Sequence, residues 1–151
     1  MPHETVNDDL FGKLTWDSDE HEWHGRSITA GGLAFRLRIE TGAWNMAPPI
    51  DDAKVDRTIS DASRRAFLRF RDSEQQAREG LVDEFVPLHA EWHGGEISPA
   101  DFKARLQLDT VQIISTGAMQ VFYNDDDMFG GHCLITHLGA SGAFDHGEMF
   151  G

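Results

Sequence analysis

The chain has 151 residues, 40% of them hydrophobic and 26% charged, which is typical of one folded domain spanning 1–151. Thirteen Lys and Arg against 26 Asp and Glu give a net charge of −13, which argues against direct nucleic-acid binding, because phosphate contacts need clustered cations. With one cysteine and no apolar run of the ~18 residues that span a bilayer, the sequence predicts a cytoplasmic protein without disulfides or membrane insertion.

The first part of the chain predicts strands after a polar start. Residues 1–9 are expected to form a loose N-terminal arm. Trp16 and Trp23 flank a polar stretch suited to a hairpin turn. From Leu33 to Glu40, apolar and polar residues alternate, as in a strand with one wet face. Gly42 to Asp52 follows neither period, so a connecting loop is expected there.

The middle of the chain changes to a helical period. Apolar residues recur every 3.6 positions between Ala53 and Arg71, which predicts an amphipathic helix. Ser73 followed by Gln76 has the spacing of a capping box and predicts the start of a second helix. Pro87 is expected to kink that helix or end it early, and Gly94-Gly95 to close it.

A third, short helix is predicted through Leu106, because Ser98 is a good N-cap and Pro99 suits the first helical position. After it, short turns separate four predicted strands, at 110–116, 118–124, 133–138 and 143–149. The expected fold class is α+β, with an antiparallel sheet built from N-terminal strands and a C-terminal meander, and about three central helices covering one face. The residues expected to face the helices are Phe35, Leu37, Val111, Ile113, Val121 and Ile135.

The connection between the second and third of these strands concentrates unusual chemistry. Asp125, Asp126 and Asp127 are followed by a Gly-Gly pair and His132. Oxygen ligands of this kind suit a hard cation, which makes Asp125, Asp127 and His132 weak candidates for a metal site. The spacing does not match an EF-hand, however. A His132 that holds the loop by hydrogen bonds to the carboxylates is the preferred interpretation.

The remaining histidines and the cysteine suggest little chemistry. His89 and His93 are four apart on a predicted helix, as in helical zinc sites, but a solvent-facing helix end is the simpler interpretation. His21 and His24 are weaker candidates beside Trp23. Cys133, in an apolar strand, is expected to be a small core residue rather than a nucleophile. No cofactor is predicted, because phosphate-binding and dinucleotide-binding motifs are missing from the sequence.

Three segments resemble a family of small bacterial domains of unknown function. They are Asp9-Leu10-Phe11-Gly12-Lys13-Leu14, the helix start Ser98-Pro99-x-x-Phe102, and Asp125-Asp126-Asp127-Met128-Phe129-Gly130-Gly131-His132. The family shares an early Phe-Gly-x-Leu and a late acidic-Met-Phe-x-Gly-His block, and Gly130 stands where a tryptophan is usual. The resemblance implies a bacterial cytoplasmic protein, a likeness to immunity-type proteins and no established reaction.

The charge distribution favours a binding function over an enzymatic one. Residues 106–151 hold six acids and no Lys or Arg. We therefore expect a non-enzymatic acidic binding protein of the immunity type that covers a basic protein partner. Its predicted binding residues are Asp125, Asp126, Asp127, Met128, Phe129 and His132. The alternative is a divalent-metal-dependent enzyme that uses His132 and the loop of Asp125 to Asp127.

Overall fold

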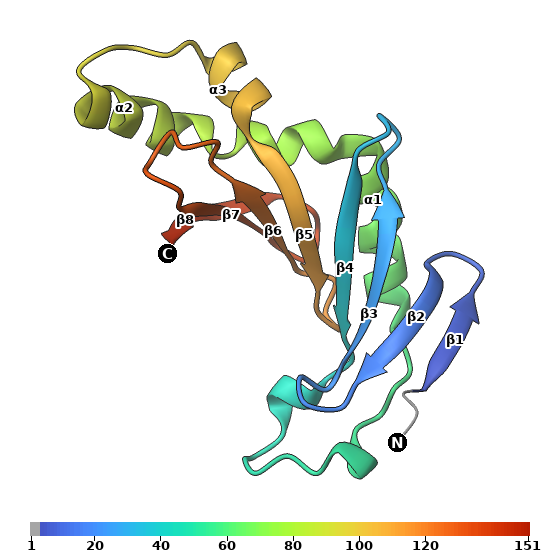
Figure 1. The fold of residues 1–151 in the computed structure, drawn as a ribbon. Helices are drawn as coiled ribbons and strands as arrows, with labels where there is room; N and C mark the ends of the chain where they lie inside the picture. The colour runs from blue at the N-terminus through green and yellow to red at the C-terminus, as the bar shows by residue number, and fades with distance from the viewer. Residues whose placement is uncertain (1–3) are drawn as a thin grey trace.

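The computed structural model describes residues 4–151, in which eight strands form one sheet and stand in chain order (Figure 1). The strands are β1 (Thr5–Asp8), β2 (Gly12–Asp17), β3 (Glu22–Ile28), β4 (Ala34–Glu40), β5 (Gln107–Ile113), β6 (Met119–Asn124), β7 (Cys133–Leu138) and β8 (Phe144–Phe150). Neighbouring strands are antiparallel except for β4 and β5. The sheet thus consists of two antiparallel meanders of four strands each, and the α+β class is confirmed.

The two meanders meet at the parallel pair of β4 and β5, in which Leu37 lies opposite Val111. A parallel pair needs a long crossover connection, and here that connection carries the helices. The helices are α1 (Asp61–Glu79), α2 (Val82–His93) and α3 (Pro99–Arg105), preceded by the short 3-10 turns η1 (Ala43–Asn45) and η2 (Asp52–Lys54). The sequence predicted that the first long strand would join the strands after Leu108 in one sheet, and this is confirmed.

Local capping sets the starts of two helices. Ser60 caps α1 by accepting a hydrogen bond from the backbone N–H of Ser63. Ser98 caps α3 in the same way, with Pro99 in the first turn, so the predicted third helix is confirmed. Both caps satisfy a backbone donor that a helix start otherwise leaves unpaired.

The predicted boundaries of the first two helices are correct at Gly94 and wrong at the start of the first helix. Helix α1 begins at Asp61 rather than near Ala53 and runs past Ser73 to Glu79. Ser73 has non-helical backbone angles, with φ of −133° and ψ of 27°, and a kink there divides α1 into two helical segments. The predicted break at Ser73 is therefore confirmed, but the segment after it ends at Glu79 rather than at Gly94. Helix α2 continues through Pro87 to His93 and ends at Gly94, whose φ of 69° is left-handed.

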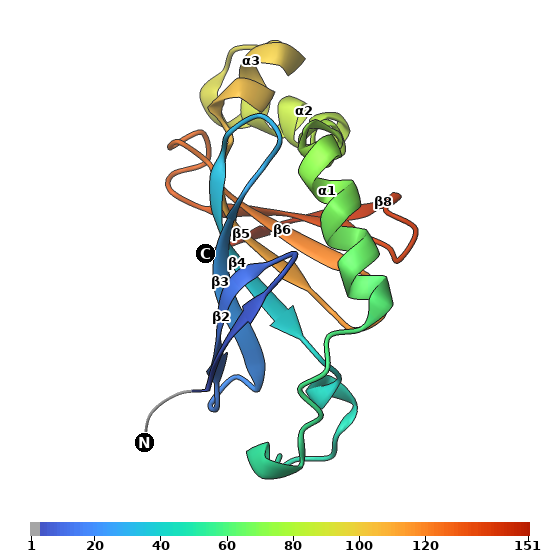
Figure 2. The same ribbon diagram turned by 90° about the vertical axis from the view of Figure 1, so that its right-hand side faces the viewer.

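Helix α1 runs along one face of the sheet, whereas α2 and α3 gather toward the end at which β5 begins (Figures 1 and 2). Phe67 of α1 packs edge-to-face on Phe11 at a centroid distance of 4.7 Å, and Phe70 packs on Phe35 at 5.6 Å. These ring contacts place the core between α1 and the first meander.

The residues predicted to face the helices do so with one exception. Phe35, Leu37, Val111, Ile113 and Val121 are in the core. Ile135 lies opposite Phe122 and Glu148, so it points to the other face, and this part of the prediction is wrong. Its neighbour Thr136 takes the inward position and donates its hydroxyl hydrogen to the Ala77 carbonyl at 2.8 Å.

The predicted loose arm at residues 1–9 is only partly within the described residues, because residues 1–3 lie outside them. Residues Thr5–Asp8 form the edge strand β1, so the expected looseness is wrong for this part. Asp8 anchors the strand through an ion pair with Arg64 of α1 at 2.7 Å. Within residues 4–151, none of the helices combines the length and apolar character that a membrane span requires.

Candidate functional site

The loop between β6 and β7 is organised around the buried carboxylate of Asp125. This side chain is 2% exposed and accepts four backbone hydrogen bonds, from the N–H groups of Asp127, Phe129, Gly131 and His132. The acceptor distances of the four bonds lie between 2.9 and 3.2 Å. Because both carboxylate oxygens are already occupied, Asp125 shapes the loop and has little capacity left for a cation.

The other two aspartates of the loop lie at its surface. Asp126 and Asp127 adopt left-handed backbone angles, with φ of 50° and 60°, which Asp tolerates better than most residues. Asp126 pairs with Arg105 of α3 at 3.0 Å between Oδ2 and Nε. Gly130 and Gly131 also have positive φ, which glycine adopts without a steric penalty. A partner molecule would therefore meet Asp126 and Asp127 at this loop.

Met128 and Phe129 do not lie on the surface, although they were predicted as binding residues. Both side chains are 0% exposed. Phe129 contacts Trp92 and Phe85 edge-to-face, at centroid distances of 5.4 and 6.0 Å. The physical reason is that the four bonds to Asp125 fold the loop inward and bring these apolar side chains into the core.

His132 is held by different partners than predicted. Its Nδ1 atom is hydrogen-bonded to the Phe129 carbonyl, and its ring lies 6.0 Å from that of Trp92. Its backbone N–H, not its ring, contacts Asp125. The predicted hydrogen bonds from the ring to the carboxylates are therefore wrong, and the ring instead fixes the loop by a local contact with its own backbone.

His89 and His93 connect α2 to the same loop. Their rings are 4.4 Å apart, and Nε2 of His93 is hydrogen-bonded to the Met128 carbonyl. His89 is buried, and burial, with smaller contributions from the neighbouring His93 and Arg105 side chains, lowers its pKa. The solvent-facing helix end expected from the sequence is thus correct for exposed His93 only. The His93 bond to the loop leaves this pair a packing role.

Helix α1 covers one face of the sheet (Figure 2), and we call the opposite face the helix-free face. A row of polar residues crosses this face. Each member lies directly opposite the next on the neighbouring strand. From β2 to β8 the row consists of Thr15, His24, Arg38, Gln112, Gln120, His137 and His146. Cross-strand partners share a face, so this register places His24 beside Arg38 in the first meander and His137 beside His146 at the other end of the row.

A cleft of about 800 Å³ hollows the helix-free face between β2 and β7. Its lining consists of Lys13, Thr15, Glu20, His24, Gly25, Arg26, Arg36, Leu37, Arg38, Asp109, Thr110, Phe122 and Cys133. This volume is within the range of roughly 300–1,000 Å³ found for small-molecule sites. The cleft is therefore large enough for a small ligand.

Two ion pairs fix the polar groups of the cleft. Arg38 donates two hydrogen bonds to the buried carboxylate of Glu22, at 2.6 and 2.8 Å, and this contact raises the pKa of Arg38. Arg36 pairs with Asp109 at 3.0 Å. Burial alone would raise the pKa of Asp109, but hydrogen bonds from Thr110 and Arg36 outweigh it and leave the pKa lowered.

Lys13 and Arg26 are the unpaired cations of the cleft, since neither has a carboxylate partner within residues 4–151. The cleft can accordingly accept a small anion, and it does not suit a basic partner. Cys133 also lines the cleft and is half-buried, so the expectation of a core cysteine is wrong. Burial raises the pKa of its thiol, which opposes a nucleophilic role.

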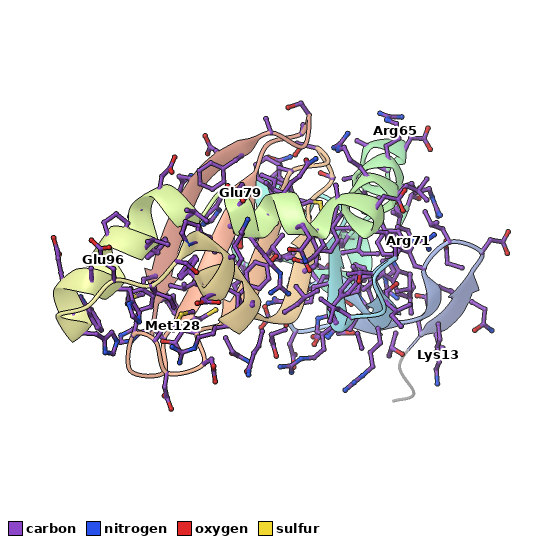
Figure 3. All side chains as sticks on the ribbon, turned by 90° about the horizontal axis from the view of Figure 1, so that it is seen from above. Lys13, Arg65, Arg71, Glu79, Glu96 and Met128 are labelled. Carbon is purple, nitrogen blue, oxygen red and sulfur yellow. The ribbon has the colours of Figure 1, made fainter. Side chains whose placement is uncertain are left out.

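Carboxylates collect at the end of the molecule formed by α2 and β8. Asp83, Glu84 and Glu91 are exposed on the outward stripe of α2, a helix without Lys or Arg. Asp145 and Glu148 are exposed on β8, the neighbouring edge strand. We call these five residues the acidic end. In Figure 3, Glu96 lies just past the end of α2, whereas Lys13, Arg65 and Arg71 lie at the opposite end of the molecule.

Comparison with known proteins places this chain among bacterial proteins. A family model described as "Uncharacterized protein conserved in bacteria (DUF2262)" matches residues 8–149. The chain belongs to the DUF2262 family. The predicted resemblance to a bacterial family of unknown function is thereby confirmed. Searches among curated proteins and among solved structures found no match.

Sequence reasoning missed the cleft and the polar row of this DUF2262 protein. The alternating polar positions of β4, including Arg36 and Arg38, were visible in the sequence. Which residues stand beside them depends on pairing with β5, which is about 70 residues further along the chain. The sequence thus indicated the polar residues that β4 contributes to the cleft. The residues that β5 contributes could be identified only from the register between the two strands.

Proposed function

We propose that this DUF2262 protein is a non-enzymatic, cytoplasmic binding protein of the immunity type, whose acidic end covers a basic protein partner. The supporting observation is the segregation of charge. From residue 79 to residue 151 the chain holds 12 Asp and Glu against two Lys and Arg. These two bases, Lys103 and Arg105, are already paired with Glu79 and Asp126. The carboxylates of the acidic end therefore retain their attraction for cations from outside.

The surface of α2 combines this charge with an aromatic anchor. Trp92 is 50% exposed at the C-terminal end of the helix, close to the acidic stripe. Tryptophan is enriched among residues that dominate binding energies, whereas charges at an interface rim mainly steer association. We infer that the carboxylates attract the partner and that Trp92 contributes the apolar contact.

The geometry moves the proposed surface away from most of the predicted binding loop. Asp126 and Asp127 are exposed and remain part of it, whereas Asp125, Met128 and Phe129 are buried. The cationic cleft on the helix-free face would repel a basic partner. The proposed contact surface therefore consists of the acidic end, Trp92 and the exposed aspartates of the loop. The alternative of a metal-dependent enzyme at this loop has no support from the bonding of Asp125.

The test requires the partner itself. Tagged protein is used to capture interacting proteins from its bacterial host, and each candidate is then purified and titrated against the wild-type chain. A variant with Asp83→Asn, Glu84→Gln and Glu91→Gln removes the α2 charges with little change in shape. We expect it to weaken binding of a basic partner by at least about tenfold at low salt, mainly through slower association, and less at high salt.

A matched control removes the same number of charges elsewhere. Asp9→Asn, Asp19→Asn and Asp72→Asn alter exposed carboxylates of the first half of the chain and should leave the affinity unchanged. Trp92→Ala should raise the dissociation rate, and thermal unfolding of the variant shows whether it still folds. A directly bound partner that is acidic, or equal losses in the α2 and control variants, would refute the proposal.

A further inference from the structure

Two imidazoles and a carboxylate meet on the helix-free face of β7 and β8, at the end of the polar row. His137 and His146 are directly opposite each other in the sheet, and Glu148 follows two positions later on the same face. The ligand atoms of these three residues all lie within 4.8 Å of one another. No part of the acidic loop contributes to this cluster, so it is separate from the metal candidates predicted from the sequence.

The imidazole of His137 already faces the carboxylate. Its Nε2 atom is 2.8 Å from Oε1 of Glu148, and its side chain is 17% exposed. The ring of His146 stacks on that of His137, with centroids 4.0 Å apart and planes 10° from parallel. A cation between Nε2 and Oε1 would take the place of the hydrogen-bonding proton, and His146 would reach it from the edge of the stack.

Asp145 supplies the orienting contact that histidine ligands usually have. Its Oδ2 atom lies 2.9 Å from Nδ1 of His146, which leaves Nε2 of that ring free to bind an ion. Carboxylate partners of this kind fix the tautomer and raise the basicity of metal-binding histidines. The register between β7 and β8 shifts just after His137, and such irregularities re-aim side chains at sheet edges.

We propose that His137, His146 and Glu148 form a binding site for a divalent transition-metal ion of the zinc class. Two nitrogens and one oxygen suit such an ion, whereas Ca²⁺ and Mg²⁺ prefer oxygen ligands alone. Ligands on one tetrahedral Zn²⁺ are roughly 3.3–3.5 Å apart, because Zn–N distances are about 2.0–2.1 Å. No two of the ligand atoms are more than 4.8 Å apart, so none has to close by more than about 1.5 Å, while His137 and Glu148, at 2.8 Å, have to open slightly. His146 and Glu148 are exposed enough to rotate.

Three protein ligands leave a fourth tetrahedral position open to solvent. The position faces the same side of the sheet as the cleft, because His137 belongs to the polar row. The site does not depend on the acidic end as a protein-binding surface, so the two proposals can fail separately. Glu148 and Asp145 are the residues that they share, and the α2 variant described above leaves both intact.

The experiment titrates untagged, metal-free protein with Zn²⁺ by calorimetry and follows Co²⁺ binding by visible absorption. We expect one Zn²⁺ per chain, a Co²⁺ spectrum of a low-coordinate nitrogen and oxygen site, and no comparable heat from Ca²⁺ or Mg²⁺. His137→Ala, His146→Ala and Glu148→Gln should each weaken Zn²⁺ binding more than about tenfold, and Asp145→Asn should weaken it less.

Two control variants separate this site from other histidines. His24→Ala removes an imidazole that also lies near two carboxylates, Asp17 and Glu22, but has no second imidazole opposite it. His93→Ala removes the pair predicted on α2. Both should keep the wild-type affinity. Several weak Zn²⁺ equivalents that survive His146→Ala and Glu148→Gln, or loss of binding in His93→Ala alone, would overturn the assignment. Circular dichroism of each variant confirms folding, so a lost affinity reports on the ligands.

Discussion

The hydroxyl of Tyr123 on β6 donates a 2.7 Å hydrogen bond to Glu74 on α1, at a point where both side chains are buried. Glu74 also accepts from Nε of Arg78 at 2.7 Å, and Arg78 donates to the carbonyls of Lys103 and Leu106. Burial, with the charge of Glu74 beside it, raises the pKa of Tyr123 well above its ordinary value. The phenol therefore stays a neutral donor that ties the sheet, α1 and the end of α3 together.

Replacing Tyr123 and replacing Glu74 should lower the free energy of unfolding by different amounts. Tyr123→Phe deletes one hydrogen bond to a charged acceptor, and we expect a loss of about 1.5–3 kcal/mol in the free energy of unfolding. Glu74→Gln leaves the buried guanidinium of Arg78 without its counter-charge, so we expect a loss of about 3–5 kcal/mol in the free energy of unfolding. Urea unfolding measures both values, and a smaller loss for Glu74→Gln than for Tyr123→Phe would contradict this network.

The buried carboxylate of Asp125 should control the stability of the loop. Asp125→Ala removes the acceptor of four backbone N–H groups, so we expect a loss of about 3 kcal/mol or more. Asp127→Asn is the control, because Asn also tolerates a left-handed backbone, and it should change stability by less than about 0.5 kcal/mol. Hydrogen exchange at Phe129 and His132 locates the effect, and unchanged protection in Asp125→Ala would disprove it.

The ion pair between Asp8 and Arg64 should make the free energy of unfolding depend on pH. The hydrogen bond from Arg64 is the main reason that the pKa of Asp8 falls from 3.8 to about 2. Because the pKa is lower in the folded state, the ionised carboxylate contributes its full stabilisation at pH values above about 4. This contribution is lost as the pH falls from about 4 to 2. Asp8→Asn should cost about 1–2 kcal/mol at pH 7 and flatten the pH dependence in that window. Denaturation curves at several pH values test this, and parallel curves for both proteins would show that the pair is ineffective.

Deleting core rings tests the packing of the helices. Phe67 is 0% exposed and Phe85 is 2% exposed, so replacing either ring with alanine leaves a cavity. We expect each of these substitutions to lower the free energy of unfolding by about 3–5 kcal/mol. Leu68→Ala should lower it by less than about 1 kcal/mol, because the Leu68 side chain is 45% exposed. Thermal unfolding compares the three variants. Equal melting temperatures would mean that the rings are not part of the core.

Features set by neighbouring residues could be predicted well from the sequence. The strand at 133–138 follows from its apolar and β-branched residues between two turns, and the start of α3 follows from a single cap; both were located correctly. The break at Ser73 was located correctly, but its hydroxyl donates to the Arg69 carbonyl instead of capping the segment that follows. Pro87 does not end α2 early, since burial of Phe85 and His89 holds the helix together on both sides of it.

Features set by distant residues could not be predicted. The direction of Ile135 depends on its register with Phe122, and a shift of one residue exchanges the two faces of a strand. The imidazoles of His137 and His146 are nine positions apart and meet only because β7 and β8 pair in one particular register. The inward position of Phe129 depends on the bonds that surround Asp125. In each case the missing information was the pairing of strands or the course of a loop.

The parallel junction of β4 and β5 has a consequence for how the chain folds. Within each meander every strand pairs with its neighbour in sequence, so these contacts close short loops and form quickly. Leu37 and Val111 must instead find each other across the whole helical segment, which carries the largest loop-closure entropy in the sheet. We therefore expect Val111→Ala to slow folding, whereas Leu134→Ala, within the second meander, mainly speeds unfolding. Stopped-flow kinetics of the two variants would show whether the rate-limiting step is the joining of two preformed half-sheets.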